Sequence, residues 1–159
     1  MAIDCWTNIV ATLADEQPQH WLLVGDLATA GKPTLLDKWP DARIETSTAE
    51  QLLAQSSLPV FDVAVLAGAM ENVAKADITR LLARLRDLHA RHIFVLLPVG
   101  SECVWQQVDL LALGFLRQDV DAETQLQLYR FELEHYKTTP EWLNSDYWAN
   151  PELFDKHRW

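Results

Sequence analysis

A glycine-containing segment and an acidic residue twenty positions further along the chain could together hold a nucleotide. The segment runs from Gly25 to Gly31 and follows a short apolar run, Trp21 to Val24. In open α/β sheets such a loop lets the backbone approach a ligand, and an acidic residue about 20 positions later contacts ribose hydroxyls. Glu45 stands at that distance from Gly25. Alternatively, Glu45 is an exposed carboxylate at the end of a strand, before a helix that begins near Thr48.

The same segment does not fit the P-loop that binds phosphate groups. That motif has four residues between its glycines and then Lys followed by Ser or Thr. Here five residues separate Gly25 from Gly31, and Pro33 stands between Lys32 and Thr34. Proline also removes a backbone N–H that would otherwise face a phosphate.

The histidines and the remaining polar residues predict no metal centre or catalytic group. His89 and His92 are three positions apart at the end of a predicted helix, where cationic side chains favourably meet free carbonyls. We expect them to cap that helix, because no acidic third ligand adjoins them. The chain has no GxSxG sequence, which marks the nucleophile of many hydrolases, so no catalytic residue is assigned.

Short apolar strands alternate with helices along the chain, and these elements must position the residues above. Strands are expected at about 21–24, 42–45, 60–66, 93–97, from 115 onward and at 126–136. Helices are expected at about 4–15, 31–39, 48–55, 74–90 and 101–113. In the last of these, Ser101 is the expected cap and Val104, Val108 and Leu111 recur at helical spacing. The alternation implies βαβ crossovers, a parallel sheet and helices on both faces.

Composition and charge favour one acidic globular domain. The chain has 159 residues, of which 49% are hydrophobic and 23% charged, and its net charge is −10. This balance excludes a disordered chain and argues against non-specific binding of nucleic acid, which depends on phosphate neutralisation. The N-terminus does not resemble a signal peptide and no apolar run is long enough to span a membrane, so we expect a cytoplasmic protein. The two cysteines, Cys5 and Cys103, are expected to be reduced.

Several local sequences, taken in order, resemble the class I S-adenosylmethionine-dependent methyltransferase family. Residues 61–66, followed by Glu71-Asn72-Val73, resemble the family's fourth strand and its loop. Leu113-Gly114-Phe115 resembles the turn into the sixth strand, and residues 131–134 lie where the family has an antiparallel seventh strand. The resemblance implies a Rossmann-like α/β fold with a mostly parallel sheet of about six strands, flanked by helices. Because the family's third strand is not evident, the implied strand order is 2-1-3-4-6-5, with the last strand antiparallel between the fourth and fifth.

The resemblance also implies a place for the cofactor and raises a difficulty with it. The implied cofactor-binding residues follow the first and third strands or lie on the second; they are Gly25, Asp26, Glu45, Ala67 and Gly68. Leu27 and Thr29 stand where the family has further glycines, and Leu23 stands where an acidic residue is common. Side chains there would crowd the loop. We therefore expect a degenerate cofactor loop.

Three functions remain open at this stage. The first is a non-catalytic binding or regulatory module, with no cofactor. The second is an active methyltransferase that uses S-adenosylmethionine on a small molecule or a protein. The third is a domain that binds a different nucleotide. Fold alone does not choose among them.

The chain is expected to form one domain with an aromatic C-terminal extension. Residues 1–17 form a leading helix, 18–136 the methyltransferase-like core and 137–159 the extension. The extension holds several large aromatic side chains: Trp142, Tyr147, Trp148, Phe154 and Trp159. Such residues pack on a face of their own domain, close over the pocket mouth or anchor a protein partner. No membrane partner is expected.

Overall fold

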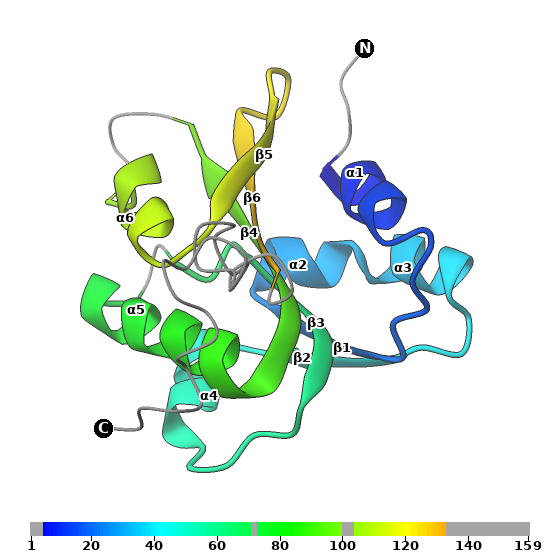
Figure 1. The fold of residues 1–159 in the computed structure, drawn as a ribbon, viewed down its shortest axis with the longest axis horizontal. Helices are drawn as coiled ribbons and strands as arrows, with labels where there is room; N and C mark the ends of the chain where they lie inside the picture. Colours follow the sequence, from blue (N-terminus) through cyan, green and yellow to red (C-terminus); the bar gives the residue numbers. More distant parts are fainter. Residues whose placement is uncertain (1–4, 71–72, 100–103, 133–159) are drawn as a thin grey trace, which may run out of the picture.

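One mixed sheet of six strands forms the centre of the computed structural model, which describes residues 5–70, 73–99 and 104–132 (Figure 1). The strands are β1 (His20–Val24), β2 (Arg43–Ser47), β3 (Phe61–Ala67), β4 (Ala90–Pro98), β5 (Leu116–Asp121) and β6 (Leu126–Glu132). Their order is β2-β1-β3-β4-β6-β5. Strands β1 to β4 are parallel, and β6 is antiparallel to both β4 and β5. The predicted fold class and strand order are confirmed.

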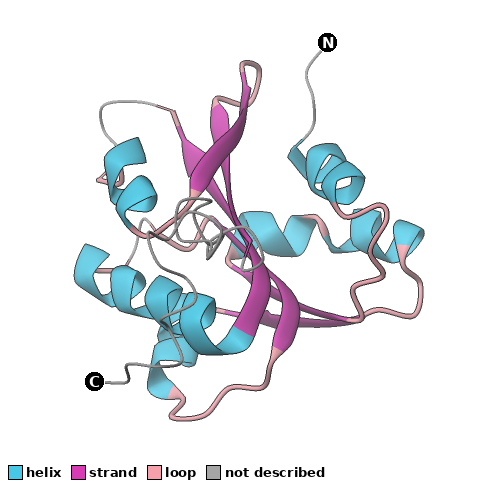
Figure 2. Cartoon of the chain, viewed as in Figure 1, coloured by secondary structure: helices cyan, strands magenta, loops and turns pink. Residues whose placement is uncertain are grey.

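Helices cover both faces of this sheet and give the molecule three layers (Figure 2). On one face lie α4 (Ala49–Ala54), α5 (Lys75–Arg84) and α6 (Gln107–Ala112); on the other lie α1 (Cys5–Thr12), α2 (Asp26–Ala30) and α3 (Lys32–Lys38). The central strands read as continuous apolar runs because both of their faces are buried. In β1, for example, Leu22 packs with the first group of helices and Leu23 with the second.

Two helices follow their sequence signals closely. Thr48 caps α4 as predicted: its hydroxyl accepts a hydrogen bond from Gln51 N, and the Gln51 side chain accepts one from Thr48 N. Helix α5 buries Ile78 and Leu81 on the sheet. It continues into a single π-helical turn, η1 (Leu85–His89), which shifts the helical phase, and Leu88, predicted to face inward, is exposed.

The helix predicted over 101–113 is shorter, and its apolar stripe does not face the core. Helix α6 begins after Gln106, so Val104 precedes it, and Ser101 lies outside the described residues. Val108 and Leu111 are exposed, whereas Leu110 is fully buried. The spacing indicated a helix correctly but selected the wrong face. The helix ends at Ala112, and Gly114, two residues later, has a φ of 93°, the left-handed conformation predicted for it.

The remaining predictions concern residues near the two ends of the chain. Helix α1 lies within the predicted leading helix, and Cys5 is a buried free cysteine. The end predicted for the last strand, Cys103 and the C-terminal extension lie outside the described residues. Among the helices of the described part, none has the length and apolar character needed to cross a membrane.

Candidate functional site

Two glycines meet at the edge of the sheet where the parallel strands end, which we call the carboxyl edge. Gly25 follows β1 with φ 98° and ψ 167°, and Gly68 follows β3 with φ 75°. A Cβ atom on Gly25 would lie 2.2 Å from the carbonyl oxygen of Ala67. The N–H of Gly25 donates to the carbonyl oxygen of Ser47, 3.3 Å away, at the end of β2. Gly25 is therefore required for three strand ends to meet closely.

The segment after Gly25, expected to be an open loop, is the short helix α2. Thr29 supports it, because its N–H and its hydroxyl both donate to the carbonyl oxygen of Gly25, at 3.1 and 3.0 Å. A Cβ atom on Gly68 would lie 3.3 Å from Leu27 Cγ and 3.6 Å from Asp26 N. The Leu27 side chain thus rests on the backbone of Gly68, with 47% of the residue's surface exposed.

Four of the five sequence-predicted site residues come together at the carboxyl edge, and Glu45 does not. Gly25, Asp26, Ala67 and Gly68 are mutual neighbours there. The prediction that the second strand ends at Glu45 is wrong: β2 continues to Ser47, and Glu45 lies opposite Leu22 in its middle.

The carboxylate of Glu45 is directed toward the opposite edge, where the parallel strands begin; we call this the amino edge. Its Oε1 lies 3.1 Å from His20 Nε2 and 2.9 Å from a guanidinium nitrogen of Arg43. His20 and Arg43 are the first residues of their strands. Glu45 therefore has ion-pair partners at the amino edge.

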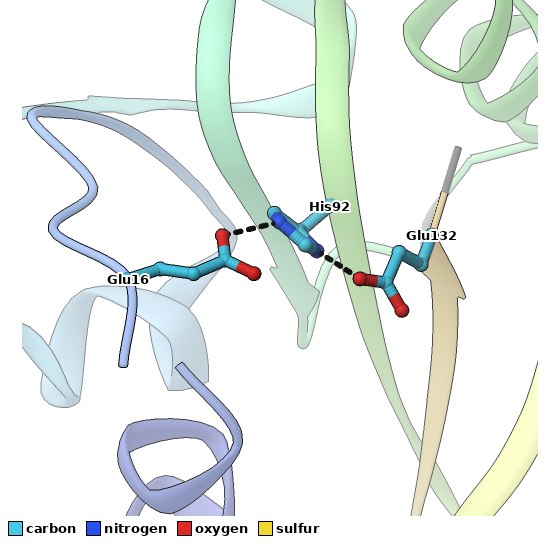
Figure 3. Close-up of side chains that lie close together, drawn as sticks. All are labelled: Glu16, His92 and Glu132. Atoms are coloured by element: carbon cyan, nitrogen blue, oxygen red, sulfur yellow. Dashed lines mark hydrogen bonds and ion pairs between the residues drawn. The ribbon is translucent and has the colours of Figure 1, made fainter. Parts of the chain in front are cut away.

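A second cluster of polar side chains lies at the amino edge, centred on His92 (Figure 3). His92 is only 3% exposed; its Nε2 lies 2.7 Å from Glu16 Oε2, and its Nδ1 lies 3.9 Å from Glu132 Oε1. Arg130 pairs with the other oxygen of Glu132 at 2.9 Å. The prediction that His92 caps a helix is wrong, because η1 ends at His89 and His92 belongs to β4. The expectation that no acidic group adjoins it is also wrong.

An open pocket of about 540 Å³ lies beside this cluster. Glu16, Asp62, Arg91 and His92 contribute to its wall. One oxygen of Asp62 accepts hydrogen bonds from the N–H groups of Gln19 and His20, at 2.8 and 3.0 Å, and so fixes the entry into β1. The walls carry charges of both signs.

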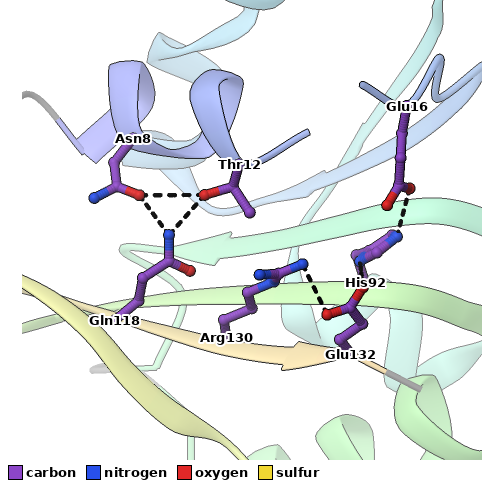
Figure 4. A network of polar contacts seen from close by, with 7 residues as sticks. All are labelled: Asn8, Thr12, Glu16, His92, Gln118, Arg130 and Glu132. Atoms are coloured by element: carbon purple, nitrogen blue, oxygen red, sulfur yellow. Dashed lines mark hydrogen bonds and ion pairs between the residues drawn. The ribbon is translucent and has the colours of Figure 1, made fainter. Parts of the chain in front are cut away.

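Helix α1 is joined to the edge strand β5 by a polar network that extends toward the same region (Figure 4). Asn8 donates to Asp119 at 2.9 Å, and Gln118 donates to Thr12 at 2.6 Å. Glu16 follows this helix, so the network helps to hold the segment that carries Glu16 over the sheet.

Solved methyltransferases have the same fold. A putative O-methyltransferase from Nostoc punctiforme PCC 73102 aligns with a TM-score of 0.58 and 11% identity, over 79% of this chain and 55% of that one. The N-methyltransferase NodS from Bradyrhizobium japonicum WM9 gives 0.54 and 14%, over 80% and 93%. Human N-acetylserotonin methyltransferase, solved in complex with SAM, gives 0.52 and 12%, over 80% and 53%. The chain spans about half the length of the first and third of these.

At these identities the likeness establishes the fold and nothing finer. The core has the architecture of S-adenosylmethionine-dependent methyltransferases, as the resemblance implied. No curated protein sequence matches the chain. One family model, described as "Family of unknown function (DUF6231)", matches residues 4–159. Because that match spans nearly the whole sequence, the chain belongs to the DUF6231 family.

Proposed function

We propose that this protein is a methyltransferase-like domain with a degenerate cofactor loop, which acts as a non-catalytic binding or regulatory module. The observation that carries the proposal is the position of Leu27. In the methyltransferase family a glycine at this position lets the backbone approach the cofactor. Here the Leu27 side chain rests on Gly68, the glycine that follows the neighbouring strand.

Two further observations argue against binding of S-adenosylmethionine at the carboxyl edge. Thr29, at a second expected glycine, is hydrogen-bonded into helix α2 through its side chain. Glu45, the expected partner of the ribose hydroxyls, is paired with His20 and Arg43 at the other edge of the sheet. An acidic side chain must stand beside the glycine loop to reach a ribose there.

Calorimetric titration of the full chain with S-adenosylmethionine and S-adenosylhomocysteine tests the proposal. We expect dissociation constants weaker than about 1 mM, which corresponds to a binding free energy less favourable than about −4 kcal/mol. Micromolar affinity for either compound would overturn the proposal and favour an active methyltransferase.

A variant that restores the family's glycine shows whether Leu27 causes the exclusion. We expect Leu27→Gly to bind S-adenosylhomocysteine more tightly than the parent chain. Leu111→Gly is the matched control, because Leu111 is 44% exposed and also lies on a short helix, α6. Both changes introduce a helical glycine, which costs about 1 kcal/mol, so only a gain confined to Leu27→Gly supports steric exclusion.

An active methyltransferase is the second candidate, and the fold of the core, which is that of S-adenosylmethionine-dependent methyltransferases, favours it. Gly25 and Gly68 do not add to this support, because Ala67 and Leu27 occupy the space beside them. This candidate requires Leu27 to move away from Gly68 when the cofactor binds. Methyl transfer from S-adenosylmethionine to small-molecule and protein acceptors would be its direct assay.

A further inference from the structure

We propose that His92 and Glu132, with Glu16 orienting the histidine ring, form a structural binding site for a divalent transition metal ion, with Zn²⁺ as its best match. The site lies at the amino edge, away from the glycines of the carboxyl edge. It joins three segments that are distant in sequence: the segment after α1, strand β4 and strand β6.

The contact with Glu16 determines which ring nitrogen of His92 carries a hydrogen. Glu16 Oε2 lies 2.7 Å from Nε2, a distance typical of a charge-assisted hydrogen bond, so Nε2 carries the hydrogen. If the ring is neutral, its lone pair is on Nδ1. A carboxylate that accepts one N–H of a histidine while the other nitrogen binds a metal is a common arrangement in zinc sites.

The other ring nitrogen of His92, Nδ1, is buried and has no hydrogen-bond partner among the described residues. It faces Glu132 Oε1 at 3.9 Å, too far for a hydrogen bond (Figure 3). A lone pair beside a carboxylate oxygen is unfavourable, so either a proton on Nδ1 or a metal cation must lie between them. Zn²⁺ binds nitrogen at about 2.0–2.1 Å and carboxylate oxygen at about 2.0–2.2 Å, which places two such ligands about 3.4 Å apart in a tetrahedral site. A shift of about half an ångström would therefore admit the ion.

Glu16 and Arg130 hold the side chains of His92 and Glu132 in position. One donor atom from each of Glu16, His92 and Glu132 lies within 4.8 Å of the other two. Glu16, whose side chain is 43% exposed, keeps its hydrogen bond to Nε2 and so orients the ring with Nδ1 toward Glu132. Arg130 binds Glu132 Oε2 and so holds Oε1 toward His92. A nitrogen ligand from His92 and a carboxylate ligand from Glu132, with water completing the coordination, suit Zn²⁺ better than Mg²⁺ or Ca²⁺, which prefer oxygen alone.

The test uses the full chain after treatment with a chelator, titrated with Zn²⁺ alone. We expect one Zn²⁺ to bind and the melting temperature to rise, whereas Mg²⁺ gives no rise. Replacing Zn²⁺ with Co²⁺ should give visible absorption bands typical of nitrogen and oxygen ligands. No binding heat and no change in melting temperature would overturn the proposal, as would an equal rise with Mg²⁺.

Variants identify the ligands without removing the buried ring. Glu132→Gln and Glu16→Gln should each weaken Zn²⁺ binding by about 10–100-fold. His20→Gln is the matched control, because it removes the other histidine–glutamate pair of the amino edge. The Co²⁺ spectrum of the unmodified chain gives an answer even if a variant fails to fold. If His20→Gln lowers the Zn²⁺ affinity and Glu132→Gln does not, the ion binds at the His20–Glu45 pair, and the proposal is overturned.

Discussion

At the scale of single residues, the glycines of the carboxyl edge are required by the fold, independently of any ligand. Gly25 has a φ of 98° and a ψ of 167°, a region that is almost restricted to glycine. The backbone of Ala67 occupies the space where a Cβ atom would project. The presence of a glycine after β1 is therefore not evidence for a working cofactor site. The close packing of strand ends around Gly25 is enough to explain why a glycine occupies this position.

We expect Gly25→Ala to lower the free energy of unfolding by about 3 kcal/mol or more, because strain and a backbone clash add. Gly68→Ala should cost less, about 1–2 kcal/mol, since an added Cβ would lie 3.3 Å from Leu27 Cγ and Leu27 N, whereas at Gly25 it would lie 2.2 Å from a carbonyl oxygen. Urea denaturation of both variants measures the difference. Equal losses would mean that the space around Gly25 relaxes more than its backbone neighbours indicate.

The sequence predicted the site only where the signal was local. Gly25 and Gly68 each follow an apolar run, so their place at strand ends could be inferred. Glu45 was misplaced because the strand continues through the polar residues 46–47, which carry no apolar signal. The contacts of His92 were missed because Glu16 and Glu132 are 76 and 40 positions away. No local pattern links them, and only the sheet brings them together.

At the scale of elements, Lys75 links the start of α5 to the first turn of α6. Its ammonium lies 2.7 Å from Asp109 Oδ2, which also accepts a hydrogen bond from Gln106 N at 2.9 Å. The hydrogen bond from Lys75 is the main cause that lowers the pKa of Asp109, and the hydrogen bond from Gln106 adds to it. The same carboxylate thus caps α6 and fastens it to α5.

This pair predicts a stability difference that depends on pH. A carboxyl whose pKa is lower in the folded protein stabilises it above the unfolded value, about 3.9, and that contribution is lost as the pH falls through the folded value. We expect Lys75→Met to reduce the free energy of unfolding at pH 7 by at most about 1 kcal/mol, because the pair is partly exposed. The difference from the parent chain should shrink below about pH 4.

Urea denaturation at several pH values checks this expectation. Arg80→Met is the control for loss of a surface charge, since Arg80 pairs with Asp77 within α5 and leaves α6 untouched. A Lys75→Met deficit that is the same at neutral and acidic pH would show that the ion pair itself does not contribute.

The elements themselves were largely predictable, and the exceptions have physical causes. The buried parallel strands β1, β3 and β4 contain continuous apolar runs, so their positions could be located from the sequence. Helix α2 was missed because the likeness to a glycine loop suggested an open backbone, whereas Leu27 and Thr29 permit a helical turn. The inward face of α6 was misjudged because helical spacing identifies a stripe but not whether anything covers it. The strand order came from the family resemblance, since alternation alone fixes no order.

At the scale of the whole molecule, the two edges of the sheet differ in character. The carboxyl edge is formed by close backbone packing, with Leu27 over Gly68. The amino edge carries the charged cluster around His92 and the neighbouring pocket. In open α/β sheets, ligands usually bind at the carboxyl edge. A functional centre at the amino edge would therefore be separate from any ligand site at the carboxyl edge.

The C-terminal extension gives the last prediction, and it concerns the whole chain. Its residues lie outside those that the structure describes, so the prediction rests on composition. A large apolar side chain gains about 1.5–3 kcal/mol when it is fully buried, and residues 142–159 include five large aromatic side chains. We therefore expect deletion of residues 138–159 to lower the melting temperature or to cause aggregation.

Limited proteolysis of the intact chain separates the two roles open to this extension. Docking on its own domain predicts protection of the extension together with a loss of stability on deletion. Val104, Val108 and Leu111 form an exposed apolar stripe on and before α6, and such a surface gains stability when aromatic rings cover it. An unchanged melting curve together with rapid cleavage after residue 137 would assign the extension to a protein partner. The identity of that partner would then indicate what the proposed module binds or regulates.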